Sequence, residues 1–153
     1  MTTCFFCAFL AGDENEYNRR EDIVLRTEHT TAFISPRTWP ANRGNVIVVP
    51  NQHVPDLESA DDQLVGEIFS AARDVAIAMR SAYACPATSL RQHNGSEAGQ
   101  EVDHLHIHVL PRYEGDQLYE RTAEHRFASA EERLGYAQRL RASLRDVAPR
   151  QTT

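Results

Sequence analysis

The chain has 153 residues, of which 41% are hydrophobic and 25% charged, a balance typical of one globular domain rather than a disordered or fibrous chain. Sixteen lysine and arginine residues against 22 acidic residues give a net charge of −6. This charge disfavours binding along a nucleic-acid backbone but allows a local pocket for a small phosphate ligand. The strongest apolar run, Val46 to Val49, is far shorter than the roughly 20 residues that span a bilayer, so no membrane association is expected.

The N-terminal residues 4–11 are apolar, but no lysine or arginine precedes them and acidic residues follow. We therefore interpret them as mature sequence rather than a secretory signal, and we expect a cytoplasmic location. Three cysteines do not make a disulfide framework, and Cys4-x-x-Cys7 indicates half of a metal site. The alternative is two unligated apolar side chains. Cys85 has no paired cysteine nearby and is expected to be a small buried residue.

Short runs of β-branched and apolar residues, bounded by turns and prolines, predict strands at 23–26, 30–34, 45–49, 88–92 and 103–110. Apolar residues at helical spacing predict a long amphipathic helix over 60–82, opened by a capping box of Ser59 and Asp62. A second capping box, Ser129 with Glu132, opens a C-terminal helix whose arginines and glutamates are expected to face solvent. Together the elements predict an α+β domain with a mainly antiparallel sheet.

Histidines and apolar residues alternate between Asp103 and Pro111. On a strand, side chains point to opposite faces in turn, so His104, His106 and His108 share one face and the residues between them pack the core. Three interpretations of this face remain open. The first is a polar sheet surface and the second is a metal site. The third is a site where one imidazole attacks phosphorus and another hydrogen-bonds the departing oxygen.

The loop that precedes these histidines favours the phosphate chemistry. Asn94-Gly95 and Ala98-Gly99-Gln100 supply small residues that let backbone N–H groups approach an anion, with amide side chains beside them. A glycine-bearing loop alone is a weak signal, but here it lies four residues before the histidine segment.

At these residues the chain resembles the histidine triad (HIT) family. Residues 104–110 match the family's signature, residues 93–112 are similar to its catalytic region, and the resemblance extends over residues 22–53, about two-thirds of the chain in all. The resemblance implies a single HIT-like domain over 1–153, with a five-stranded, mainly antiparallel sheet, one long helix and a C-terminal helix. Its core would be about 4–112 and its C-terminal extension 113–153. It also implies a homodimer.

The family further implies a nucleotide hydrolase or nucleotidyl transferase that acts on a nucleotide or dinucleotide at the α-phosphorus, with no organic cofactor. His106 would be the nucleophile that forms a nucleotidyl-histidine, and His108 would hydrogen-bond the phosphate or the leaving oxygen. A third histidine favours hydrolysis, and the ending Pro111-Arg112 is similar to dinucleoside polyphosphate hydrolases rather than to phosphoramidases. By the same resemblance, the nucleotide and phosphate contacts would be Arg37, His93, Asn94, Gly99, Gln100, Glu101 and Val102.

Some HIT proteins resemble this chain in a further respect: an N-terminal C-x-x-C, the histidine of P-x-x-H and the first triad histidine hold a structural zinc ion. Carried over, the zinc ligands are Cys4, Cys7, His53 and His104. Two thiolates and two imidazoles suit a closed tetrahedral site with no open position for catalysis.

Two departures from the family pattern affect the predicted site. Asn45 stands where many members have histidine, and Arg37 stands where many bind ribose through Asp or Asn. Two alternatives therefore stay open: a nucleotide-binding protein without turnover, and a metalloenzyme whose zinc ligands are His104, His106 and His108. Trp39 is expected either to stack on a base or to pack under a loop.

Overall fold

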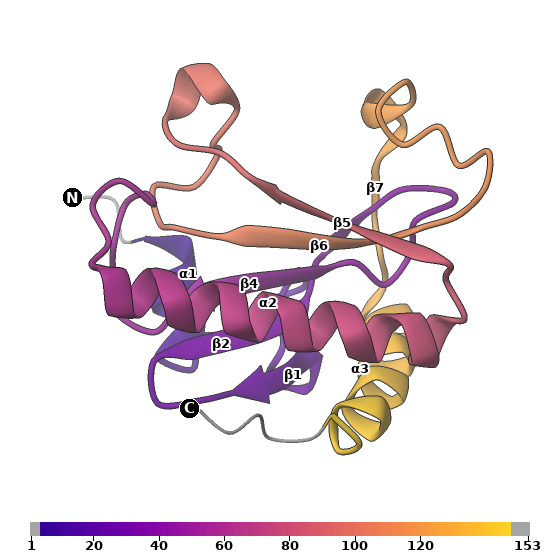
Figure 1. The fold of residues 1–153 in the computed structure, drawn as a ribbon, viewed down its shortest axis with the longest axis horizontal. Helices are drawn as coiled ribbons and strands as arrows, with labels where there is room; N and C mark the ends of the chain where they lie inside the picture. The colour runs from indigo at the N-terminus through magenta and orange to yellow at the C-terminus, as the bar shows by residue number, and fades with distance from the viewer. Residues whose placement is uncertain (1–3, 148–153) are drawn as a thin grey trace.

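A five-stranded antiparallel sheet forms the centre of the computed structural model, which describes residues 4–147 (Figure 1). Its strands, in chain order, are β1 (Ile23–Arg26), β2 (Thr30–Ile34), β4 (Val46–Pro50), β5 (Ala87–Gln92) and β6 (Ile107–Arg112). Their spatial order is β1-β2-β4-β6-β5, and each neighbouring pair is antiparallel. The predicted α+β fold is confirmed.

Alternation along the central strands gives the sheet two buried faces. On one face, residues such as Ile34, Val48 and Ile107 pack against the long helix α2 (Asp62–Tyr83). On the other face, Phe33, Ile47 and Val49 pack against the short N-terminal helix α1 (Phe5–Leu10). Leu105 and Val109 belong to the α2 side with Ile107. His104 and His106 contact Phe6 of α1, and His108 alternates with Ile107 and Val109, so the three histidines lie on the α1 side of the sheet.

The long helix α2 lies across one face of the sheet, as Figure 1 shows. Its predicted apolar stripe is buried: Leu64, Ile68, Ala72, Val75 and Met79. The predicted capping box of Ser59 and Asp62 does not form. Asp61 is the N-cap, and its carboxylate accepts a hydrogen bond from the Leu64 N–H, whereas Ser59 bonds to Asp56. Asp61 takes the N-cap role that was predicted for Ser59, because it directly precedes the helix and its carboxylate reaches the unpaired amides of the first turn.

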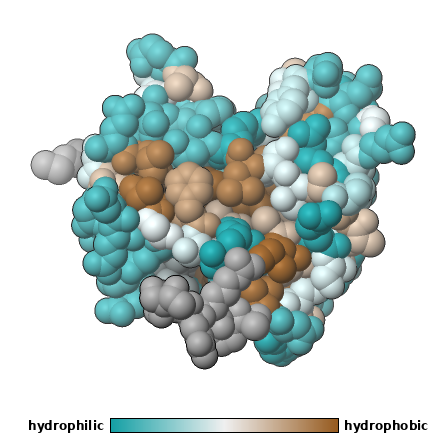
Figure 2. Space-filling model, viewed as in Figure 1, coloured by the Kyte–Doolittle hydropathy of each residue, from teal (hydrophilic) through white to brown (hydrophobic). Residues whose placement is uncertain are grey.

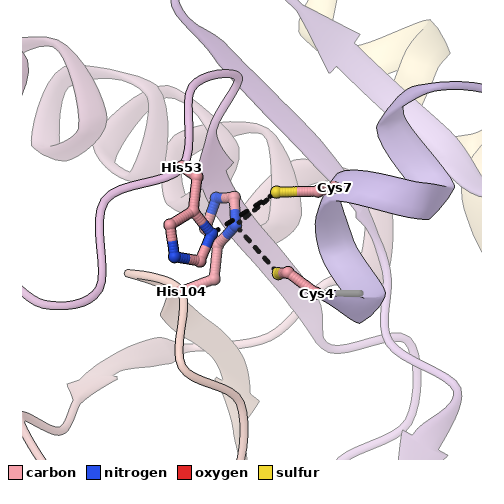
Figure 3. A group of neighbouring side chains, drawn as sticks. All are labelled: Cys4, Cys7, His53 and His104. Atoms are coloured by element: carbon pink, nitrogen blue, oxygen red, sulfur yellow. Dashed lines mark hydrogen bonds between the residues drawn. The ribbon is translucent and has the colours of Figure 1, made fainter. Parts of the chain in front are cut away.

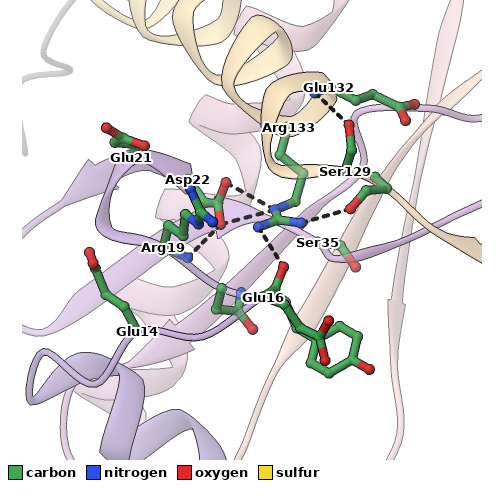
Figure 4. A network of polar contacts seen from close by, with 12 residues as sticks. Glu14, Glu16, Arg19, Glu21, Asp22, Ser35, Ser129, Glu132 and Arg133 are labelled. Carbon is green, nitrogen blue, oxygen red and sulfur yellow. Dashed lines mark hydrogen bonds and ion pairs between the residues drawn. The ribbon is translucent and has the colours of Figure 1, made fainter.

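The C-terminal helix α3 (Ala130–Leu144) packs against α2 and β1, and its Ser129 cap accepts from the Glu132 N–H as predicted. The expectation that its arginines all face solvent is wrong at one position. Arg133 is fully buried and its Nε donates to both carboxylate oxygens of Asp22 at 3.0 Å (Figure 4). A buried guanidinium needs such a partner, so this contact ties α3 to the N-terminal segment.

Other boundaries differ from the sequence prediction. The strand expected at 103–110 begins at Ile107, because the preceding amides bond to loops: His104 N–H to Val102 O and Leu105 N–H to Val54 O. It then continues through Pro111, which faces Thr88 of the edge strand β5. A two-stranded sheet of β3 (Arg37–Thr38) and β7 (Arg126–Phe127) was not predicted, and neither was helix α1.

Three short 3-10 turns complete the described elements: Arg20–Asp22, Ser96–Ala98 and Thr122–Glu124. Cys85 is buried, as expected. Within residues 4–147, the helices are too short or too polar to cross a membrane.

Candidate active site and metal centre

Two thiols and two imidazoles converge where α1 meets the sheet (Figure 3). The Cys4 Sγ lies 3.3 Å from His104 Nδ1, and the Cys7 Sγ lies 3.4 Å from His53 Nδ1 and 3.6 Å from His104 Nδ1. All four candidate ligand atoms lie within 4.8 Å of one another. Cys4 and Cys7 come from the start of α1, His53 from the loop after β4, and His104 from the segment before β6.

This group fits a zinc ion by both chemistry and geometry. Metal–ligand bonds of roughly 2.0–2.3 Å in a tetrahedron place the ligands roughly 3.3–3.8 Å apart, close to the distances found here. The other ring nitrogen of His104, Nε2, lies 3.0 Å from the carbonyl oxygen of Pro50. Since a carbonyl oxygen only accepts, Nε2 carries the hydrogen and Nδ1 offers its lone pair to the group. The residues would thus hold a structural metal and leave no open position on it.

The tautomer and orientation of His106 are fixed by its neighbours, and they differ from those of His104. Its Nδ1 lies 2.7 Å from the carbonyl oxygen of His104, so Nδ1 carries the hydrogen and Nε2 keeps its lone pair. Burial lowers the pKa of His106 and outweighs the hydrogen bond to the His104 carbonyl, which raises it, so the neutral ring is favoured. The Phe6 ring packs edge-on against His106, with ring centroids 5.4 Å apart, and fixes the imidazole further. A neutral, immobilised imidazole with a free nitrogen is a competent nucleophile.

These two hydrogen bonds argue against a catalytic metal held by the three triad histidines. Both nitrogens of His104 are engaged elsewhere, and within residues 4–147 the group of Cys4, Cys7, His53 and His104 is the one cluster that fits a metal ion. His106 is outside it.

His108 follows on the same face, and its ring centroid lies 5.1 Å from that of His106. Burial, then the neighbouring His106 and Arg91, lowers the pKa of His108 to about 3, so the ring is neutral in the ligand-free protein. Its Nδ1 is buried and has no hydrogen-bond partner among the described residues. A bound anion would satisfy such a nitrogen once it is protonated.

A pocket opens over His106 and His108 on the α1 side of the sheet. The pocket lining includes seven residues for which the sequence predicted a role. The two predicted catalytic residues are His106 and His108, and the five predicted nucleotide contacts are Arg37, His93, Gly99, Glu101 and Val102. Arg37 pairs with Glu101, with Nη1 and Oε1 2.9 Å apart, and this bond lowers the pKa of Glu101. Gly99 has a positive φ of 91°, and a Cβ there would lie 3.2 Å from His93 Nδ1, so glycine allows this close approach.

The other two predicted contact residues, Asn94 and Gln100, do not line this pocket. The Asn94 Oδ1 accepts from Leu57 N–H, and the Gln100 amide donates to the carbonyl oxygens of Pro55 and Val102. The side chains that looked free to bind phosphate thus hold the loop together. The amides of Gly99 and Gln100 are also used within the loop, bonding to Ser96 O and Gly95 O.

Several pocket residues were missed by sequence reasoning. Phe5 and Phe6 come from α1, Arg91 from β5, and Phe127 from β7, while Asn18 comes from the segment before β1. Asn18 is fully buried and both its amide atoms lack hydrogen-bond partners within residues 4–147. The alternation of side chains along β5 could have predicted Arg91 as a pocket residue, because Arg91 pairs with His108 in the β5–β6 ladder and points to the same face. Trp39, for which two roles were open, is buried at the pocket wall and donates to Thr122 O.

Asn45, one of the two departures from the family pattern, is fully buried and does not line the pocket. Both atoms of its amide lack a hydrogen-bond partner in the described part of the chain. Arg37, the other departure, does line it.

Fold and site together define a small α+β protein that places a histidine-lined pocket beside a Cys2His2 group. Comparison with known proteins agrees: the HIT domain family matches residues 16–115, and the chain belongs to this family. An uncharacterized HIT-like protein of Methanocaldococcus jannaschii is 33% identical over 114 residues, which cover 74% of this chain and 81% of the relative.

Two further relatives bear on the site. The crystal structure of a Zn-bound histidine triad family protein from Mycobacterium smegmatis superposes with a TM-score of 0.77 and 27% identity, over 94% of both chains. The asymmetrical bis(5'-nucleosyl)-tetraphosphatase of Schizosaccharomyces pombe is 29% identical over 94 residues, which cover 61% of this chain and 50% of that enzyme.

Proposed function

We propose that this protein is a nucleotide hydrolase, or a nucleotidyl transferase, that works through a covalent nucleotidyl-His106 intermediate. The observation that carries the proposal is the fixed tautomer of His106, whose Nδ1–H donates to the His104 carbonyl and whose Nε2 is left as a nucleophile in the pocket. The relative named as a bis(5'-nucleosyl)-tetraphosphatase supports dinucleoside polyphosphates as substrates.

The reaction has two balanced steps. The Nε2 lone pair of His106 attacks the α-phosphorus, a P–N bond forms, and the bond from phosphorus to the leaving group breaks with its electrons on the departing atom. Water, or another acceptor in a transfer reaction, then attacks the same phosphorus. The P–N bond breaks, its electron pair returns to Nε2, and the nucleotide leaves with the acceptor oxygen while one proton is released.

The neighbouring groups assist without forming covalent bonds. We infer that His108 hydrogen-bonds the phosphate or the leaving group, since its ring is next to His106 in the same pocket. Gly99, Val102, His93 and the Arg37–Glu101 pair would line the path of the nucleotide. Aromatic walls at Phe5 and Phe127 offer apolar surface to a base.

We further propose that Cys4, Cys7, His53 and His104 hold a structural zinc ion. The donor set and its spacing support zinc, and so does the Zn-bound relative. The metal would stabilise the contact between α1 and the sheet. Cysteines that form no disulfide are typical of proteins in a reducing compartment, so we propose that the protein acts in the cytoplasm.

A homodimer is also proposed. Leu90 on the edge strand β5 and Phe69 and Ile77 on α2 are exposed apolar side chains. The face that carries α2 is turned toward the viewer in Figure 2, where apolar patches interrupt a hydrophilic surface. A second copy packed there would cover them.

The catalytic proposal is tested with His106→Ala and, as a matched control, His29→Ala in an exposed turn. We expect His106→Ala to lower turnover of a dinucleoside tetraphosphate by at least about 1,000-fold, and His29→Ala to have no effect. Mass spectrometry of the wild-type protein quenched during turnover should detect one nucleotidyl group on His106. Unchanged hydrolysis by His106→Ala refutes the nucleophile, and nucleotide binding without turnover of any anhydride or phosphoramidate favours the non-catalytic alternative.

A further inference from the structure

The pocket is positively charged in a negatively charged protein. Two arginines, Arg37 and Arg91, line it together with three histidines, and Glu101 is the one carboxylate among its lining residues. The whole chain carries a net charge of −6. With His106 and His108 neutral, the two arginines and one carboxylate leave one positive charge in excess, which is expected to attract an anion.

The two arginines differ in what surrounds them. Arg37 is paired with Glu101 at 2.9 Å, so its charge is largely compensated. Arg91 makes no ion pair among residues 4–147, and its Nε is buried without a hydrogen-bond partner. A half-buried guanidinium with unused donors is costly unless a ligand supplies the acceptor.

Arg91 is also held in a defined place. It faces His108 in the antiparallel ladder of β5 and β6, so both side chains lie on the pocket side of the sheet. Its guanidinium carbon lies over the Trp39 ring, 5.4 Å from the centroid, and the Trp39 indole is fixed by its bond to Thr122 O. Stacking on an aromatic face leaves the planar edge of a guanidinium free to donate.

His108 therefore has His106 as one neighbour, with ring centroids 5.1 Å apart, and Arg91 opposite it on β5. We propose that Arg91 binds the phosphate group beyond the one attacked by His106, so that the preferred substrates are nucleotides whose leaving group is itself a phosphate. This inference rests on the proposed function and narrows it, because it selects phosphoanhydrides over phosphoramidates.

The chemistry of the leaving group gives the reason. When a phosphoanhydride is cleaved, the P–O bond breaks with its electron pair on the departing phosphate oxygen, and a fixed guanidinium stabilises that growing charge. When a phosphoramidate is cleaved, the departing nitrogen needs a proton, which an arginine does not supply at neutral pH. An unpaired arginine next to His108 thus suits the first reaction.

The test measures equilibrium binding of AMP and of the α,β-methylene analogue of ADP, which has a second phosphate and no cleavable oxygen bridge. Isothermal titration calorimetry compares the wild-type protein with Arg91→Gln, Arg91→Lys and Arg26→Gln. Arg26 is exposed on β1, at the opposite edge of the sheet, so its variant has the same change in charge as Arg91→Gln. Circular dichroism and metal analysis check that each variant is folded.

We expect Arg91→Gln to weaken binding of the ADP analogue by about 10- to 100-fold and binding of AMP by less than about threefold, the range for one or two charged hydrogen bonds. Arg91→Lys should be intermediate and Arg26→Gln unchanged. Equal losses for both ligands would mean that Arg91 only supports the Trp39 wall, and no loss for either would mean that it is outside the site. Both results overturn the inference while leaving the proposed function in place.

Failure of the proposed function has a separate readout, the hydrolysis assay of the wild-type protein. If that protein turns over no anhydride or phosphoramidate, the proposed function is refuted, and the inference about its leaving group falls with it. A kinetic measurement adds an independent readout. In Arg91→Gln, kcat/KM for a dinucleoside polyphosphate should fall by about 10-fold or more relative to kcat/KM for a nucleoside phosphoramidate. An equal fall for both substrates contradicts selection of the leaving group.

Discussion

The buried pair of Asp22 and Arg133 offers a direct test of how the C-terminal helix is attached. Arg133 donates to Asp22 through Nε, to Ala128 O through Nη1 at 2.7 Å and to Glu16 O through Nη2 at 3.2 Å. Both side chains of the pair are almost fully buried, at 0% and 2% exposed. The guanidinium therefore joins α3 to the N-terminal segment that holds Glu16 and Asp22 (Figure 4).

Asp22→Asn keeps the shape of the side chain and removes its charge, which leaves the Arg133 guanidinium buried with carbonyl partners alone. We expect a loss of about 3 kcal/mol in the free energy of unfolding, the usual cost of an uncompensated buried charge. Adding Arg133→Met removes the unpaired buried charge. The loss of unfolding free energy in the double variant should therefore be smaller than the sum of the losses in the two single variants, by about 2 kcal/mol.

Urea unfolding at pH 7 with zinc present measures all three variants. The control is Glu132→Gln, which breaks the more exposed ion pair with Arg126 and should cost less than about 1 kcal/mol. If the costs of Asp22→Asn and Arg133→Met simply add, the two residues are not coupled and the electrostatic reasoning is wrong.

Two further predictions concern the metal and the response to acid. Cys7→Ser should lose bound zinc and unfold about 10 °C lower, whereas Cys85→Ala should keep its zinc, as read by metal analysis and thermal unfolding; zinc retained by Cys7→Ser would exclude the ligand set. The hydrogen bond from Arg112, with others from Tyr113 N–H and Asn42, holds the pKa of Asp116 well below its usual value. Because the folded-state pKa is depressed, the stabilisation is present above about pH 4, the unfolded pKa, and is lost as the pH falls below it. Asp116→Asn should cost about 2 kcal/mol at pH 7 and flatten stability between pH 4 and 2 in urea titrations, and an unchanged acid slope would contradict this.

Patterns with a fixed period could be read from the sequence. The alternation from His104 to Val109 placed three imidazoles on one side of the sheet, and the helical spacing from Leu64 to Met79 predicted the buried stripe of α2. The group of Cys4, Cys7, His53 and His104 followed from the resemblance to HIT proteins, and the structure brings those four side chains together.

Contacts between distant segments left no such pattern. The amides of Asn94 and Gln100 looked free in the sequence, but their partners are backbone atoms of the loop around residues 55–57. Arg133 was one charge among many on α3, and its burial depends on Asp22, which is 111 positions earlier. Phe127 reaches the pocket because two-residue strands pair, and pairs so short have no recognisable period.

The short helix α1 determines where a functional fragment of this protein would have to begin. Phe6 lies between the two cysteines in sequence, and its ring contacts both His104 and His106, so residues 4–7 supply two of the four candidate metal ligands and one wall around His106. The region matched by the HIT domain family begins at residue 16 and ends at 115. A fragment trimmed to those limits would keep all three triad histidines but lose Cys4, Cys7 and the Phe6 ring that packs against His106.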